Sequence, residues 1–463
     1  MAKRARSRRK LAIWAALPPY LGGKRRLCPL IFREIDRVLP RRLWVGRTFL
    51  DAFLGGGSVS LYAKAQGFRV IATDIATRAV TIGRALIENS RVRLTYNDVV
   101  RLAAPTDAPP GRIEREYVPS VFTQAQGRFI DRALATAGKT EDPAKAALFR
   151  LLAVRVALLA HPYSQVRKGT IHRVTTGEYE SITESAVYHY VDGLRLTHPD
   201  KLWALARQIN AGVFQGEGRV LQTSVLDALP TIEADVVYFD PPYPGVMSYE
   251  REYKVIDEIL EGASRPTSPF TARDGAAMID GLFEQARHIP IWLLSLGNAV
   301  VTIGELEEKM ARLGRRTRAI EIKYQHLPAV ATDEKKEKNR EFLVVGWDPE
   351  SELLRSVGKI SPTAPEQDLA FVPGEVEIHL DRRGALRPAP SGFLQDGFQE
   401  GHAPLVEKSD PRIGAGMSPE GEPRVDLPDA ALHSMAGDRD VKARALHDDH
   451  PSRVLPFETP VKS

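Results

Sequence analysis

The stretch Asp235-Val236-Val237-Tyr238-Phe239-Asp240-Pro241-Pro242-Tyr243 joins an apolar run to an acid, two prolines and an aromatic ring. The apolar residues predict a short buried strand, and the prolines end it because they fix φ and carry no N–H. Beyond the strand, Asp240 offers a carboxylate, Pro241 a carbonyl acceptor and Tyr243 a flat face. Such groups suit the capture of a planar base through its exocyclic amine, at the strand end where open α/β sheets bind ligands. The alternative is an ordinary strand-ending turn.

A second segment, Thr48 to Ser60, predicts a short strand, a triple-glycine turn and a helix that begins near Ser58. Glycines allow a tight turn and let a ligand approach the main chain without a Cβ in the way. The spacing matches neither the dinucleotide-binding fingerprint nor a phosphate-binding loop. Asp51 ends the strand just before the turn, and an acid there suits a cationic amine better than a pyrophosphate.

A further strand is expected over Arg69–Thr73 and is followed by Asp74, 23 residues after Asp51. A carboxylate at this position commonly binds ribose hydroxyls, although for Asp74 taken alone a solvated strand-end acid is the favoured interpretation. A ligand with a positive amine, a ribose and a purine fits both acids, and S-adenosylmethionine has all three. The loop Tyr20-Leu21-Gly22-Gly23-Lys24 lies before the first strand and, by itself, can be a simple entry to the helix expected over 27–38.

Taken in order, the three segments resemble the Dam-type (alpha-group) family of adenine-N6 DNA methyltransferases, over roughly residues 15–348. The resemblance implies a Rossmann-like class I methyltransferase sheet, S-adenosylmethionine as cofactor and double-stranded DNA as partner, with no metal. It implies a catalytic clamp of Asp240, Pro241, Pro242 and Tyr243. The cofactor-binding residues it implies are Tyr20, Gly22, Gly23, Lys24, Asp51, Phe53, Gly55, Gly57, Ser58 and Asp74. Asp227 is added as a candidate for the cofactor's adenine, with an ordinary loop acid as the alternative. The chain departs from the family pattern at Ala52, where Pro is usual, and at Gly56, where Ala is frequent.

The chain divides into regions of different pattern. Residues 15–100 and 220–348 alternate apolar runs and helical stretches, which predicts an α/β catalytic domain. Residues 101–219 form a largely helical insert, with helices expected over Phe122–Ala137 and Pro143–Leu159. We interpret this insert as a target-recognition region, against the alternative of a solvated helical hairpin with a loop. Its likeliest DNA-binding residues are Gln165, Arg167, Lys168 and Arg173.

The ends of the chain differ from its middle. Residues 1–14 predict a flexible basic arm, and residues 349–463, rich in Pro and Gly, a mostly disordered tail. Residues 351–463 contain 13 Lys and Arg against 19 Asp and Glu, a net charge of −6. The whole chain carries +5, so residues 1–350 carry +11, which suits a polyanionic partner.

The amino-acid composition excludes several classes of protein. The 463 residues are 43% hydrophobic and 27% charged, which predicts a soluble chain with a large core. We expect no membrane association, and a cytoplasmic, nucleoid-associated protein of bacterial or phage origin. The single cysteine, Cys28, excludes intramolecular disulfides and Cys-based zinc clusters. Cys28 does not follow a proline as a nucleophilic cysteine would, which disfavours attack of its thiolate on cytosine C5. We expect Cys28 to be a small, buried apolar residue.

The expected reaction is site-specific methylation of the N6 amine of an adenine that leaves the duplex stack. The alternatives are methylation of cytosine N4 or of an RNA base amine, and a non-catalytic nucleic-acid-binding relative. Asp at the first clamp position favours adenine over cytosine N4. A monomer is plausible; the recognised DNA sequence, the tail's role and the choice between restriction-modification, phage and regulatory roles stay open at this stage.

Overall fold

The structure, a computed structural model, describes residues 13–20, 22–160, 195–243, 249–262, 268–271, 277–297, 301–323 and 340–357. All of them belong to one compact unit, which runs from Met1 to Phe398. The expected DNA-facing residues Gln165, Arg167, Lys168 and Arg173 lie outside the described residues, as do residues 1–12 of the basic arm and the tail from residue 358.

A seven-stranded sheet forms the centre of this unit, in the order β3-β2-β1-β4-β5-β7-β6. Neighbouring strands are parallel from β3 to β5, whereas β7 runs antiparallel to both β5 and β6. All seven strands that the apolar runs of the sequence predict are present, with ends within two residues of the predicted bounds 49–53, 69–73, 220–223, 236–239, 291–296, 318–324 and 342–346. Their bounds are β1 Thr48–Asp51, β2 Arg69–Asp74, β3 Gly218–Gln222, β4 Val236–Phe239, β5 Ile291–Gly297, β6 Arg316–Lys323 and β7 Arg340–Trp347.

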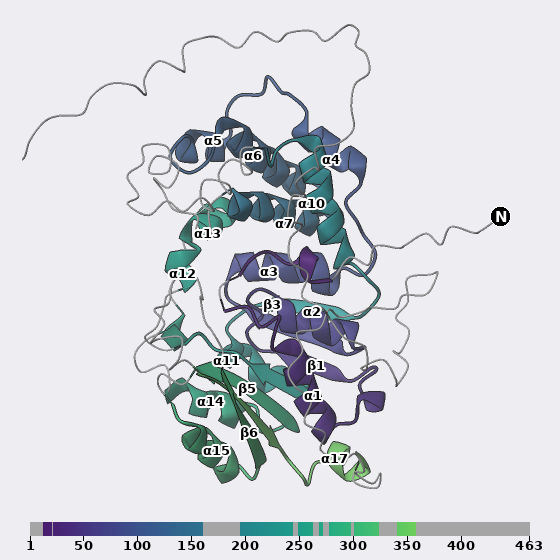
Figure 1. The fold of residues 1–463 in the computed structure, drawn as a ribbon, viewed down its shortest axis with the longest axis vertical. Coiled ribbons are helices and arrows are strands. Elements are labelled where there is room, and N and C mark those ends of the chain that lie inside the picture. Colours follow the sequence, from purple (N-terminus) through teal and green to yellow (C-terminus); the bar gives the residue numbers. More distant parts are fainter. Residues whose placement is uncertain are drawn as a thin grey trace, which may run out of the picture. The chain divides into compact units, whose positions relative to one another are not determined.

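Helices cover both faces of the sheet, and the alternation of side chains along each strand divides the core in two. On β4, Val236 and Tyr238 point into one cluster, while Val237 and Phe239 point into the other. The first cluster packs under α1 Cys28–Val38, α2 Ser58–Ala65 and α3 Thr77–Gly83. The second packs under α11 Val225–Ala228, α14 Met278–Gln285 and α15 Ile303–Arg312 (Figure 1). Cys28 is fully buried in the first cluster, as predicted.

The expected insert is helical, and its helices share the first cluster instead of forming a core of their own. Both predicted long helices are present as α6 Gln124–Lys139 and α7 Pro143–Leu159. Asp142 caps α7 by accepting hydrogen bonds from two backbone amides, and Pro143 occupies the first turn. Helix α7 packs against α3 and the π-helix Arg84–Glu88 (Figure 1). The boundaries 101 and 219 of a target-recognition region remain a prediction.

Shorter elements complete the described part of the chain. Regular structure extends past the predicted start of the tail, because α17 follows β7. No helix among the described residues has the length and apolar character that a bilayer crossing requires. The bounds are α4 Tyr96–Ala103, α5 Arg112–Tyr117, α10 Pro199–Ala211, α12 Tyr249–Glu252, α13 Lys254–Glu261 and α17 Glu352–Val357, with single turns at Ile13–Ala16, Arg41–Leu43, Leu229–Thr231 and Pro269–Thr271.

The strand order reverses between β1 and β4, and this reversal positions the site. The chain leaves β1 toward β2 and leaves β4 toward β5, so the connections diverge and open a crevice at the carboxyl ends of the two strands. Asp51 ends β1 in register with Tyr238 of β4, two residues before Asp240. Both acids therefore lie at the same edge of the sheet, where parallel α/β sheets bind ligands.

The second hydrophobic cluster, which packs under α11, α14 and α15, allows a direct test of the fold. Trp292 on β5 is fully buried, stacks on Phe283 with ring centroids 5.2 Å apart, and donates its indole N–H to the Ala286 carbonyl at 3.0 Å. We expect Trp292→Ala to lower the free energy of unfolding by about 3–5 kcal/mol, because it leaves a cavity and removes one of two hydrogen bonds that the Ala286 carbonyl accepts. Denaturant titration measures this free energy of unfolding. Val45→Ala, at a side chain 77% exposed, is the control and should change stability by less than about 0.5 kcal/mol; equal effects would contradict the assigned core.

Candidate active site

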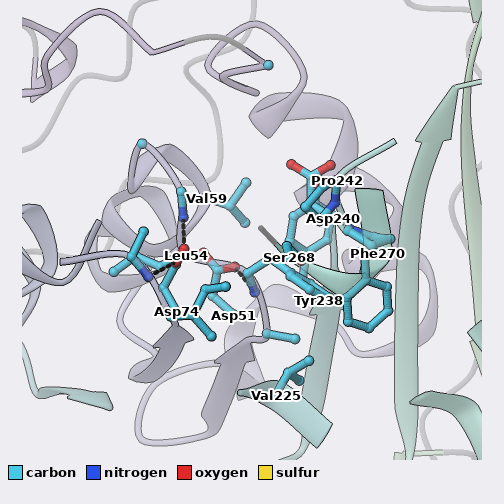
Figure 2. Close-up of a pocket in the computed structure, with 18 of the residues that line it drawn as sticks. Asp51, Leu54, Val59, Asp74, Val225, Tyr238, Asp240, Pro242, Ser268 and Phe270 are labelled. Atoms are coloured by element: carbon cyan, nitrogen blue, oxygen red, sulfur yellow. Dashed lines mark hydrogen bonds between the residues drawn. The ribbon is translucent and has the colours of Figure 1, made fainter. Parts of the chain in front are cut away.

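A cavity of about 950 Å³, part of it open to solvent, lies over the carboxyl ends of β1, β2 and β4. Figure 2 shows Asp240 and Pro242 on one side of this space, Asp74 and Leu54 on the other, and Asp51 between them. The clamp and the glycine turn, about 185 residues apart in sequence, thus face one cavity. The predicted residues that line it are Tyr20, Gly22, Gly23, Lys24, Asp51, Phe53, Gly55, Ser58, Asp74, Asp240, Pro241 and Pro242.

Hydrogen bonds from backbone amides to side chains fix the glycine turn and the loop that runs from Tyr20 to Lys24. The amide of Lys24 donates to the Ser58 hydroxyl at 3.2 Å, which joins the loop to the first residue of α2. The amide of Gly55 donates to the Asp74 carboxylate at 2.9 Å. The other oxygen of Asp74 accepts from the Ala76 amide at 2.8 Å. Asp74 therefore fixes the glycine turn as well as facing the cavity.

The glycines of the turn are required by its geometry. Gly55 and Gly57 have φ of +49° and +74°, a conformation that L side chains rarely adopt. Gly56 is needed for a different reason, since a Cβ there would lie 2.7 Å from the Cβ of Tyr20. This close approach accounts for Gly at a position where the family often has Ala.

The other departure from the family pattern also has a structural reason. Ala52 is buried, and its amide donates to the carbonyl of Tyr238 at 3.0 Å, a bond that ties β1 to the clamp strand. Proline carries no N–H and could not make this bond. Ala52 thus strengthens the connection between the glycine turn and the clamp.

Asp51 is a buried carboxylate at the floor of the cavity, with 1% of its side chain exposed. Burial raises its pKa to about 7, even though Ser60 donates a hydrogen bond to it at 2.7 Å. A carboxyl group held near its ionisation point is poised to respond to a cationic ligand.

Lys24 connects the loop to the clamp, and its ammonium is almost fully buried. It donates to Asp240 Oδ1 at 2.7 Å, to the Gly22 carbonyl at 3.2 Å and to the Tyr243 hydroxyl at 3.3 Å. Glu341 Oε1 lies 3.5 Å away. Burial by itself would lower the pKa of Lys24, but the charges of Asp240 and Glu341 outweigh it and hold that pKa well above its usual value. Lys24 therefore stays charged.

Tyr243 is held at its hydroxyl and along its ring. The hydroxyl donates to the carboxylate of Glu341, 2.7 and 2.6 Å from its two oxygens. Gly297, the last residue of β5, lies beside the ring, and a Cβ there would come within 3.2 Å of it. Burial raises the pKa of the Tyr243 phenol well above its usual value, so the hydroxyl remains a donor.

A group of polar and aromatic side chains connects the cavity to α13 and the helical insert. The ring of Tyr20 stacks on Tyr253 at 4.9 Å, and its hydroxyl accepts from Arg78. Arg78, which lines the cavity, forms a buried ion pair with Asp257 on α13. From the insert, Arg112 donates to the carbonyls of residues 258 and 259 at the end of this helix, at 2.9 and 2.8 Å.

Three predicted residues lie outside the cavity wall. Gly57 is the N-cap of α2 and packs against Ile82. Asp227 is exposed on α11, and Tyr243 lies beside the cavity on Glu341. Sequence reasoning missed several residues that do line it, because they carry no motif. These are Ile75, Ala76, Arg78, Thr223, Ser224, Val225, Tyr238, Ser268, Pro269 and Phe270. It also missed Glu341, although an acid directly before the apolar run of β7 was a visible signal.

Comparison with known proteins agrees with this geometry. Residues 20–113, which contain Tyr20, the glycine turn and Asp74, match the family described as D12 class N6 adenine-specific DNA methyltransferase. This match and the relative described next indicate an adenine-specific DNA methyltransferase. It is 28% identical over 347 residues to the Type II methyltransferase M2.HphI of Haemophilus parahaemolyticus, an alignment that covers 70% of this chain and 95% of that protein.

The buried ammonium of this methyltransferase can be tested by substitution. We expect Lys24→Met to lower the free energy of unfolding by about 3 kcal/mol or more, because it removes the cation that the buried Glu341 and the partly exposed Asp240 contact. The control is Lys309→Met, which breaks an exposed ion pair with Asp280 of the same 2.7 Å length and should cost less than about 1 kcal/mol. Denaturant titration of both variants gives the comparison. Similar losses would show that burial of Lys24 does not govern the energy of this contact.

Proposed function

We propose that this methyltransferase transfers the methyl group of S-adenosylmethionine to the N6 amine of an adenine flipped out of double-stranded DNA. The observation that carries the proposal is the shared cavity, in which the clamp of Asp240 to Pro242 faces the glycine turn of Gly55 and Gly56. A donor on the glycine side and an acceptor amine on the clamp side would meet within one enclosed space.

The donor side of the cavity has the chemistry that S-adenosylmethionine requires. Asp51 supplies an anionic partner for an amine, and Asp74 lies where a carboxylate binds ribose. Phe53 and Phe270, with ring centroids 5.1 Å apart, give an apolar wall that suits a purine. When bound there, S-adenosylmethionine supplies a methyl group carried on a positively charged sulfur. Asp227 remains a proposed contact of the cofactor's adenine and would require α11 to approach it.

On the acceptor side the protein orients the amine. Adenine N6 is paired within a duplex, so the base must leave the stack to reach Asp240. The Asp240 carboxylate and the Pro241 carbonyl would accept hydrogen bonds from the amine, and Tyr243 would offer its ring for stacking. Lys24 donates to Asp240 Oδ1 and so helps to orient this carboxylate. Catalysis of this kind rests on positioning and electrostatics, without a covalent enzyme intermediate.

The helical insert is proposed to recognise the target sequence. Its contacts with α13, through Arg112 and the hydrogen bond from the Tyr117 hydroxyl to Glu258 at 2.9 Å, place it next to the segment that follows the clamp. Gln165, Arg167, Lys168 and Arg173 are the proposed DNA contacts. The similarity to a Type II methyltransferase supports a role in restriction-modification.

The clamp acid provides the main test of function. We expect Asp240→Ala to lower methylation by about 100-fold or more, because the amine loses its principal acceptor. Folding and cofactor binding should persist, since Lys24 still faces Glu341. Transfer of tritium from labelled S-adenosylmethionine to duplex DNA, followed by nuclease digestion, measures the rate and identifies the nucleoside. Asp280→Ala, an exposed acid, is the control. Unchanged turnover in Asp240→Ala, or label in a nucleoside other than deoxyadenosine, would refute the assignment.

The raised pKa of Asp51 predicts that cofactor binding depends on pH. With a folded pKa of about 7 against an ordinary 3.8, Asp51 in the free protein keeps its proton below about pH 7. The cationic amine favours the ionised carboxylate, so binding releases a proton and the affinity rises between pH 5.5 and 7, by up to about tenfold per pH unit. This window lies below the range, roughly 7.7–8.0, in which an α-amino group loses its charge.

Calorimetry in two buffers of different ionisation enthalpy measures this proton release. Asp51→Asn should bind more weakly and without the pH slope. The same raised pKa makes the free protein lose stability as the pH rises from about 4 to 7, because the folded state keeps a proton that the unfolded chain releases. A pH-independent affinity in the unsubstituted protein would rule out contact between Asp51 and the amine.

A further inference from the structure

We propose that Glu341 is a positioning residue for methyl transfer, which orients the Tyr243 ring and the Lys24 ammonium against the clamp. No motif marks this residue, and it stands about 100 positions after the clamp in sequence. The inference rests on the proposed function, because it assigns a role within the same site. Glu341, Tyr243, Lys24 and Asp240 are called here the clamp tetrad.

The position of Glu341 is unusual for a structural residue. It lies on β7 between Arg340 and the apolar run that begins at Phe342, and its side chain is fully buried. Burying a carboxylate costs stability unless ionic and hydrogen-bonding partners offset the loss of water. A sequence that accepts this cost inside a strand breaks a local rule of folding, and such exceptions gather at functional sites.

The contacts of Glu341 lead directly to the clamp. Its two carboxylate oxygens lie 2.7 and 2.6 Å from the Tyr243 hydroxyl, and Oε1 lies 3.5 Å from the Lys24 ammonium. Lys24 in turn contacts the Tyr243 hydroxyl at 3.3 Å and Asp240 at 2.7 Å. Each member of the clamp tetrad is therefore held by at least one other, and Glu341 is the member on the rigid sheet.

The role follows from what these groups do during the reaction. Methyl transfer forms a bond from the N6 lone pair to the methyl carbon, while the carbon–sulfur electron pair stays on sulfur as a neutral thioether. Nitrogen gains the positive charge and then releases a proton to solvent. This in-line geometry tolerates little displacement of the base. A stacking ring anchored at its hydroxyl by β7, with Gly297 beside it, keeps the base in line.

Glu341→Gln tests the inference because it keeps the side-chain length and one acceptor oxygen but removes the charge. We expect the single-turnover methylation rate to fall roughly tenfold or more, as when a preorganised polar group is lost from an active site. The affinity for S-adenosylmethionine should stay close to that of the unsubstituted protein, while the thermal midpoint should fall, because the buried Lys24 ammonium loses one of its two carboxylates. Glu321→Gln, an exposed acid on β6 whose register partner is Phe342, is the matched control and should leave the rate unchanged.

A double-mutant cycle with Tyr243→Phe separates positioning from a general structural effect. If Glu341 acts through the Tyr243 hydroxyl, the doubly substituted enzyme should be no slower than about the slower single variant. Losses that multiply, or a Glu341→Gln rate equal to the unsubstituted one, would overturn the proposal. If Glu341→Gln fails to fold, Tyr243→Phe decides alone, because it breaks the same bond from the other side and a full rate would overturn the proposal.

The failure of this inference differs from failure of the proposed function. If the unsubstituted protein transfers no label to adenine in duplex DNA, the proposed function fails. If it does so and Glu341→Gln is equally active, the inference alone fails.

Discussion

A buried ammonium between two carboxylates is the contact on which the active site depends. Lys24 comes from the loop before the first helix, Asp240 follows β4, and Glu341 stands on β7. A charge taken out of water must find partners at close range, because isolated ions in a protein interior are costly. Three distant parts of the chain therefore have to converge within a few ångströms. The need of the buried ammonium for charged partners therefore fixes the clamp, in addition to the strand β4 that carries it.

The strand order provides the space in which that convergence occurs. The reversal between β1 and β4 leaves a crevice that no crossover helix fills, so Asp51 and Asp240 face a cavity instead of a packed core. The glycine turn lines the same crevice, since Gly56 leaves room for Tyr20 and Asp74 fixes the Gly55 amide. The glycine turn and the clamp thus face one cavity because of one structural feature of the sheet.

The helical insert and the cavity are joined through α13. Residues of this helix contact Arg78 at the cavity wall and Arg112 of the insert. The helix comes shortly after the clamp in sequence, so one helix connects the insert, the cavity wall and the segment that follows the clamp. Rigid supports of this kind hold reacting groups more accurately than loops do.

The sequence by itself determined the seven strands, the two long helices of the insert and the residues of three local motifs. Strand and helix patterns arise from neighbours two to four positions apart, and motifs such as Asp240 to Tyr243 are local in the same sense. Only the tertiary structure decided that Lys24 contacts Asp240, that Glu341 anchors Tyr243, and that Arg78 and Phe270 line the cavity. It also placed Asp227 on the surface. These contacts join residues more than fifty positions apart or depend on burial, which strand order and packing determine and no local pattern contains.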